Sequence, residues 1–174
     1  MWPHPGSLTV FLYFAAGSVA IVWGVFQSPA IDYRMVMAGS LLATVEIPFG
    51  VGPLQSLLAP VVALGLVMAA TVGRRLVRRQ WLGVPIGMFL RLVLDGSWSN
   101  ASTFWWPITS VDRLGRSAPV LDRGWWSALL ELVGLALALG LWTAFGLDDL
   151  GRRSKFVRTG QLDRSFVKDQ AARS

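Results

Sequence analysis

Four ionisable side chains lie within otherwise apolar stretches of the sequence: Glu46, Arg91, Asp95 and Glu131. A charged group inside a bilayer costs about 2.5–3.5 kcal/mol on insertion scales, so such residues are candidates for function. Arg91 and Asp95 are four residues apart, a spacing that places both side chains on one face of a helix. The pattern therefore predicts a polar cluster inside a membrane, in its outer half.

This predicted cluster has two interpretations. It can form an outward-facing polar pocket, to which Ser97 and Asn100 add hydroxyl and amide groups after Asp95. Alternatively, Arg91 pairs with a carboxylate, and the pair fixes the packing of the helices. Because the three acids outnumber the single arginine, one acid would be protonated or would hold a cation.

The rest of the composition excludes several kinds of chemistry. The sequence has no cysteine and a single histidine, His4, so it predicts neither thiolate chemistry nor a metal site built on several histidines. It contains no glycine-rich phosphate loop, no His-Glu-x-x-His zinc motif and no nucleophile elbow. We therefore expect no cofactor and no bound metal, and the residues specify no reaction.

The elements that carry these residues are predicted to be membrane-spanning helices. Apolar residues make up 53% of the 174-residue chain and charged residues only 15%, against about 25% charged in an average soluble domain. A helix of about 20 apolar residues spans the hydrocarbon core of a bilayer. The sequence therefore predicts an all-α, polytopic transmembrane bundle of four or five spans over residues 1–150. The predicted spans are 8–26, 31–49, 54–72, 81–98 and 125–147, of which 31–49 is the weakest because Asp32, Arg34 and Glu46 interrupt it.

Two basic clusters predict the orientation of this bundle. One consists of Arg74, Arg75, Arg78 and Arg79, and the other is the tail at 151–174. Cytoplasmic loops carry an excess of Lys and Arg, so both clusters and the C-terminus are expected in the cytoplasm. If segment 31–49 crosses the membrane, there are five spans and the N-terminus is outside; if it is re-entrant, there are four. The uncharged start of the chain favours five.

The composition also indicates where the chain resides and what it contacts. Its bias towards Arg over Lys, with abundant Gly, Ala, Val and Leu, is typical of a GC-rich bacterial genome. We expect a multi-pass protein of the plasma (inner) membrane, in contact with the lipid bilayer and with other membrane proteins. The basic tail is expected to bind anionic lipid headgroups. Because the basic clusters are interpreted as topogenic charge, no nucleic acid is expected as a partner.

Small residues recur at four-residue spacing, a pattern that lets helix backbones approach closely. The ridges are Ala16, Ala20 and Gly24; Gly65, Ala69 and Gly73; and Gly83 and Gly87. We expect them to pack helices within one bundle rather than to form a dimer face. Pro85, between Gly83 and Gly87, predicts a kink near the inner end of its helix.

Short segments of the chain resemble a known family. They are Ile31-Asp32-Tyr33-Arg34, Gly39-Ser40-Leu41-Leu42, Gln55-Ser56-Leu57-Leu58, Leu90-Arg91-Leu92-Val93-Leu94-Asp95 and Phe104-Trp105-Trp106-Pro107. In these segments the sequence resembles the membrane-bound metal-dependent hydrolases of the LexA-binding inner-membrane family. The resemblance covers about residues 31–107, and its motifs are short and apolar.

The sequence departs from the family at the positions that the resemblance assigns to chemistry. Gln55 stands where the family has a histidine before Ser-Leu-Leu, Arg91 replaces the second histidine, and Ala43-Thr44 replaces a Pro-Asp step. Only Asp95 carries over as a ligand, whereas zinc requires about three protein ligands. The resemblance therefore implies a shared fold more than a shared activity.

We interpret the chain as an integral membrane protein of unknown activity, and as a non-catalytic relative of these hydrolases. Three alternatives stay open: an active hydrolase on lipid-linked or envelope substrates, a structural or accessory subunit of a membrane complex, and a transport component. Stoichiometric metal would favour the first, copurifying proteins the second, and flux that is lost on Asp95→Asn the third.

Overall fold

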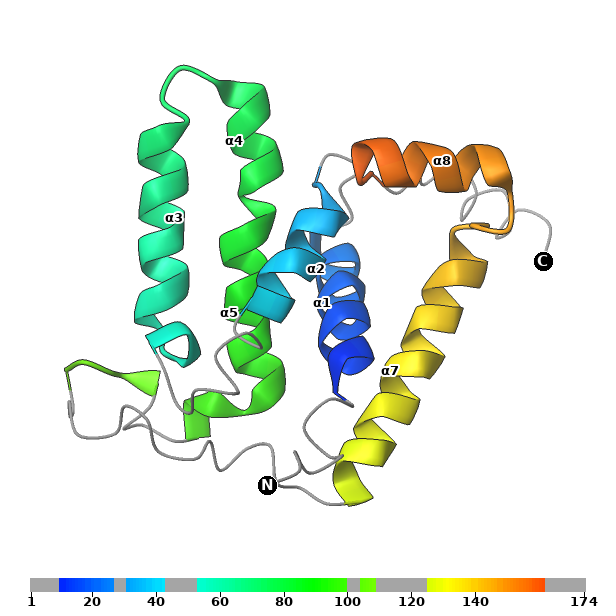
Figure 1. Cartoon of the computed structure of the whole chain (residues 1–174), viewed down its shortest axis with the longest axis horizontal. Coiled ribbons are helices and arrows are strands. Elements are labelled where there is room, and N and C mark those ends of the chain that lie inside the picture. Colours follow the sequence, from blue (N-terminus) through cyan, green and yellow to red (C-terminus); the bar gives the residue numbers. More distant parts are fainter. Residues whose placement is uncertain (1–9, 27–30, 43–52, 100–103, 109–124, 162–174) are drawn as a thin grey trace, which may run out of the picture.

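Figure 1 shows the computed structural model of the chain, which describes residues 10–26, 31–42, 53–99, 104–108 and 125–161. Every regular element within these residues is a helix, and no strand occurs among them. Long apolar runs without strict alternation of polar and apolar residues favour helices over strands. The all-α prediction is therefore confirmed.

The chain runs back and forth between two ends of the molecule (Figure 1). The elements in order are α1 (Phe11–Phe26), α2 (Tyr33–Leu42), η2 (Pro53–Gln55), α3 (Leu58–Ala70), α4 (Arg75–Trp81), α5 (Gly83–Asp95), η3 (Ser97–Ser99), α7 (Trp125–Ala144) and α8 (Leu150–Thr159). α1, α3 and α7 run in one direction, and α2 and the α4–α5 rod run in the other. We call the end that holds the α3–α4 turn and α8 the basic end, because the arginines at 74–79 and the described part of the basic tail lie there.

α2 and α5 pack very closely, because glycines on each helix lie against the backbone of the other helix. A Cβ added at Gly87 would overlap the carbonyl oxygen of Val36, and one added at Gly39 would overlap the carbonyl oxygen of Val84. Gly83 lies against Asp32 and Met35 in the same way. The expectation that Gly83 and Gly87 pack helices within the bundle is confirmed.

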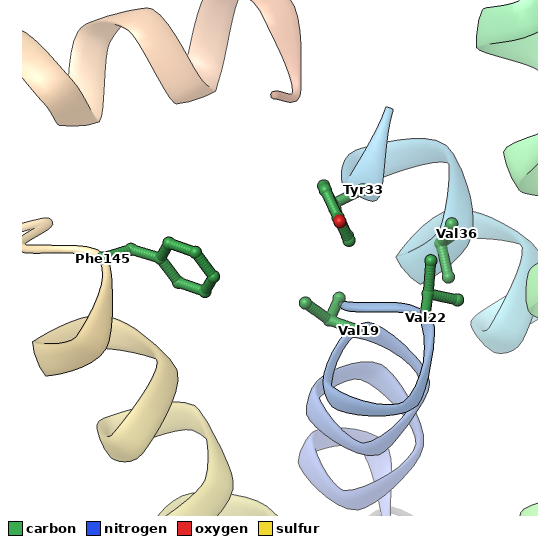
Figure 2. Packing of buried hydrophobic residues seen from close by; sticks show 5 residues of the cluster. All are labelled: Val19, Val22, Tyr33, Val36 and Phe145. Atoms are coloured by element: carbon green, nitrogen blue, oxygen red, sulfur yellow. The ribbon is translucent and has the colours of Figure 1, made fainter. Parts of the chain in front are cut away.

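The buried core lies where α1, α2 and the end of α7 meet. Figure 2 shows its members, Val19, Val22, Tyr33, Val36 and Phe145. The ring of Phe145 stands at 88° to that of Trp23, with 5.4 Å between the ring centroids. These contacts join α7 to the α1–α2 pair near the basic end.

The outer faces of α3 and α7 are apolar and exposed. On α3 only Pro60 is buried, and the exposed residues include Leu58, Val61, Val62, Leu64, Leu66 and Met68. The segment Ser127–Ala144 of α7 is long and apolar enough to cross a membrane, and only 11% of it is buried in the molecule. α1 and α3 are apolar but shorter. Within the described residues, one helix is therefore long and apolar enough to cross a membrane.

In two of the three predicted small-residue ridges, a glycine does not lie against another helix. A Cβ added at Gly65 or at Gly24 would meet no atom within 4 Å. The expectation that these two glycines pack helices within the bundle is wrong, because no other helix of the described chain covers those faces.

The rod formed by α4 and α5 is interrupted at Leu82, between the two helices. Pro85 has no N–H to donate, and its ring clashes with the carbonyl four residues earlier, that of Trp81. The two helices therefore separate one turn before Pro85, and the kink itself stays a prediction. The loop expected between spans 54–72 and 81–98 is wrong in part, because Arg75, Arg78 and Arg79 lie on α4.

α8 is fixed to the start of α2. The N–H of Tyr33 donates to the carbonyl oxygen of Gly160 at 2.9 Å, and Arg34 Nη1 donates to the carbonyl oxygen of Val157. Gly160 ends α8 in the left-handed conformation, with φ +67°. A guanidinium beside the last carbonyls of a helix also interacts favourably with the helix dipole. The first part of the predicted tail at 151–174 is thus a docked helix, and residues 162–174 lie outside the described residues.

The predicted spans correspond to helices of the structure, but the bounds of the spans differ from those of the helices. Span 54–72 begins as the short helix η2 and continues as α3, and span 81–98 corresponds to α5 with η3. Span 125–147 corresponds to α7. Only the first part of span 31–49 is described, as α2, and Glu46 lies outside the described residues.

Candidate functional site

Arg91 is buried in the middle of the bundle, with 3% of its surface exposed. Its guanidinium carbon lies 4.0 Å from the centroid of the Phe14 ring, above the ring. Its Nη1 donates to the carbonyl oxygen of Ser40 across 3.5 Å. The charge of Arg91 is therefore stabilised from two other helices, by a cation–π contact from α1 and a backbone acceptor from α2.

The glycines between α2 and α5 make this contact possible. Gly87 lies one turn before Arg91 on α5 and lets the backbone of α2 come against α5 at Val36. The carbonyl of Ser40, one turn further along α2, then comes within reach of the guanidinium. Sequence analysis identified Gly87 and Arg91 separately but gave no signal that joined them.

Asp95 follows Arg91 by one helical turn and is also buried, with 8% of its surface exposed. The negative charge of Asp95 acts on Arg91, and its Oδ2 accepts a hydrogen bond from Ser97 Oγ at 3.2 Å. Gly96 ends α5 in the left-handed conformation, with φ +71°, which turns Ser97 back towards the carboxylate. Within the described residues, Arg91 and Asp95 are the predicted site residues that lie on one element.

Glu131 has a different place in the structure. It lies on α7, and its Oε1 accepts a hydrogen bond from the backbone N–H of Leu12 at 3.3 Å. Leu12 belongs to the first turn of α1, where backbone N–H groups have no partner within the helix and a negative charge is favourable. Glu131 thus caps α1. α7 comes this close because Gly134 lies directly against the backbone of Tyr13.

Ser127 precedes Glu131 by one turn and is 4% exposed. The second oxygen, Oε2, is buried and has no hydrogen-bond partner among the described residues. The predicted cluster is therefore distributed: Arg91 contacts α1 and α2 from α5, Asp95 accepts a hydrogen bond from Ser97 at the end of α5, and Glu131 contacts the start of α1 from α7.

The described chain is similar to no known family model, no curated protein and no solved structure. The site must therefore be interpreted from its own residues.

The residues at the resembling positions do not form a metal site. Gln55 is buried at 8% exposure, and its Nε2 is a donor without an acceptor among the described residues. Arg91 places a fixed positive charge under the Phe14 ring, where a metal ligand would be needed. The described residues contain no group of three or more His, Cys, Asp or Glu side chains that could hold a metal ion. The metal that the hydrolase resemblance implies does not fit this donor set.

The geometry of Arg91 and Asp95 supports a packing role. Ser97 and Asp95 form a hydroxyl–carboxylate pair, but the only histidine of the chain, His4, lies outside the described residues. The Ser97 hydroxyl holds the carboxylate in place at the end of α5. Phe14 and Ser40, which sequence analysis missed, complete the surroundings of Arg91 from helices that are distant in sequence.

Proposed function

We propose that the chain is a multi-pass integral protein of the plasma (inner) membrane that serves as a non-catalytic structural or accessory component of a membrane complex. The observation that carries this proposal is the apolar, exposed surface of α3 and α7. In water such a surface would drive aggregation, because soluble monomers rarely expose large continuous apolar patches. In a bilayer the same surface faces lipid tails at no cost.

The path of the chain supports five crossings. α1, α2, α3, the α4–α5 rod and α7 alternate in direction between the two ends of the molecule (Figure 1). α7 has 20 residues and reaches about 30 Å, the thickness of the hydrocarbon core.

The distribution of charge supports a cytoplasmic location for the basic end. The α3–α4 turn, the α4 helix that follows it and α8 lie at the same end of the molecule (Figure 1). The turn and α4 carry Arg74, Arg75, Arg78 and Arg79, and α8 carries Arg152, Arg153, Lys155 and Arg158. Two clusters that are distant in sequence thus meet on one side, as the excess of positive charge in cytoplasmic segments would require.

The buried polar residues support a non-catalytic role. Arg91 contacts α1 and α2, the buried Asp95 accepts a hydrogen bond from Ser97, and Glu131 caps α1. A relationship to the membrane-bound hydrolases would then be one of fold, without the metal chemistry. Metal bound stoichiometrically by the purified chain would overturn this part of the proposal.

The absence of cysteine from the sequence allows a direct test of the topology. Single cysteines would be introduced at Ser154 on α8 and at Ile108, which is 83% exposed. The segment that holds Ile108 lies near the start of α3, because the N–H of Leu57 donates to the carbonyl oxygen of Phe104. A membrane-impermeant maleimide should label Ile108→Cys in intact cells and Ser154→Cys only after permeabilisation. Labelling of Ser154→Cys in intact cells would overturn the orientation, and extraction of the chain by alkaline carbonate would overturn membrane integration.

A further inference from the structure

The α3–α4 turn forms an open, basic hollow at the basic end. The hollow has a volume of about 670 Å³ and is lined by Gly73, Arg74, Arg75, Leu76, Val77 and Arg78. Gly73 makes the tight turn possible with φ +77°, a conformation that favours glycine. Three arginines thus line one open space.

The positive charge of this hollow is not balanced by the described protein. Arg74 and Arg78, and likewise Arg75 and Arg79, are four residues apart, a spacing at which like charges on a helix repel. No Asp or Glu occurs in the sequence between Glu46 and Asp95. The ion pairs found within the described chain belong to Arg34 and Arg152 instead. An external anion would remove this repulsion.

Two apolar side chains flank the hollow and are almost fully exposed. Val72 is 77% exposed and Leu76 is 78% exposed. Apolar side chains directly beside arginines match the boundary of a bilayer, where lipid tails meet headgroup phosphates. The apolar surface of α3 continues from this turn down the helix.

We propose that the hollow binds the phosphate of an anionic phospholipid headgroup in the cytoplasmic leaflet. Arg74, Arg75 and Arg78 donate to the phosphate oxygens, for which the planar guanidinium is well suited. Val72 and Leu76 contact the upper part of the acyl chains. This inference rests on the membrane placement proposed above, but it concerns a binding site at the turn rather than the topology of the chain.

The test measures lipid binding to the full-length chain in neutral detergent by native mass spectrometry. Short-chain phosphatidylglycerol is titrated against phosphatidylcholine of the same chain length. The triple variant Arg74→Gln, Arg75→Gln, Arg78→Gln should lose affinity for phosphatidylglycerol by about fivefold per arginine, on the order of 100-fold in total. The matched control Arg153→Gln, Lys155→Gln, Arg158→Gln removes the same charge from α8 and should retain most of the affinity.

Equal losses in the two triple variants, or no loss in either, would overturn the site. The triple lysine variant at the same three positions keeps the topogenic charge and serves where the glutamine variant does not insert. It should bind phosphatidylglycerol less tightly than the arginine chain, and unchanged affinity contradicts a guanidinium site. If the unmodified chain binds a short DNA duplex and does not prefer phosphatidylglycerol to phosphatidylcholine, the lipid site is contradicted and nucleic acid is the ligand instead. Carbonate extraction distinguishes failure of this lipid site from failure of the proposed membrane placement. A chain that resists extraction but does not prefer phosphatidylglycerol contradicts only the lipid site.

Discussion

The α2–α5 interface and the free face of α3 carry the same sequence pattern but have opposite surroundings. Gly83 and Gly87 lie against the backbone of α2, whereas Gly65, within an equivalent small-residue ridge, faces open space. The difference is the presence of a partner helix with glycines of its own, here Gly39. A small-residue ridge therefore permits close packing but does not specify it.

Polar residues follow the same division between the two regions. Arg91 and Ser40 meet at the packed interface, where Arg91 is 3% exposed and Ser40 is fully buried. α3 has no charged residue between Leu58 and Ala70. In a bilayer, polar contacts between helices add specificity, whereas a helix face towards lipid needs only apolar surface.

Loss of the charge at the packed interface should have the largest effect. Arg91→Leu leaves Asp95 buried without its positive neighbour and should lower the free energy of unfolding by about 3–5 kcal/mol. Adding Asp95→Asn should restore part of the loss. Arg79→Leu, at an exposed position of α4, serves as the control and should change stability by about 0.5 kcal/mol or less. Thermal unfolding in detergent measures all three variants, and a harmless Arg91→Leu would contradict the packing role of this residue.

The second largest effect is expected when a leucine side chain is shortened. This change should distinguish the packed side of α5 from the free face of α3. Leu92 is 2% exposed on α5, and Leu66 is 65% exposed on α3. Leu92→Ala leaves a cavity and should cost about 2–5 kcal/mol, whereas Leu66→Ala should cost about 0.5 kcal/mol or less. Chemical denaturation monitored by tryptophan fluorescence gives both values. A large loss in Leu66→Ala would show that α3 is covered in solution, and the comparison would then fail.

Addition of a single methyl group should separate the two ridges. Gly87→Ala forces α2 away from α5 and should cost about 1–3 kcal/mol. Gly65→Ala meets no atom within 4 Å and should be neutral or stabilise by up to about 1 kcal/mol, because alanine favours helix. Melting temperatures of the two variants in the same detergent test this. Similar losses at both positions would mean that the face of α3 at Gly65 is packed.

The smallest effect is expected where the packed region meets α8. Gly160→Ala places a Cβ in the left-handed conformation, at a cost of about 1–2 kcal/mol, and against Asp32. The control Gly151→Ala lies on the exposed side of the same helix, where the nearest atom would be 3.4 Å away. Trypsin should then cleave at Arg152, Arg153 and Arg158 faster in Gly160→Ala than in the control. Equal cleavage rates would show that α8 is not held by the start of α2.

The sequence allowed the helices to be predicted because hydropathy and proline act locally. The all-α class, the positions of α1, α3, α5 and α7, and a break near Pro85 all follow from residues adjacent in the chain. The helical conformation of Arg75–Trp81 was missed because a run of arginines suggests a loop. Arginine is a good helix former, and the preceding Gly73 had already completed the turn.

The contacts of the candidate site were less accessible, because they join residues that are distant in sequence. The spacing of Arg91 and Asp95 predicted a shared helix face, but nothing in the sequence indicated that Phe14 would cover the guanidinium. Glu131 has the expected buried carboxylate oxygen, yet its partner is a backbone N–H of α1 rather than another charge. Asp32 and Arg34 weakened the predicted span 31–49, and the structure shows instead that they form an ion pair at 3.2 Å beside α8.

The bond between Arg34 and the carbonyl of Val157 joins residues separated by 123 positions in the chain. Synthesis must therefore reach α8 before Arg34, on the first turn of α2, obtains this partner. Until Gly160 has been synthesised, the start of α2 lacks the contacts that α8 supplies. A nascent chain arrested before that residue should be more sensitive to proteases than one arrested after it. The order of translation thus makes the closing of this bundle a late event in its biogenesis.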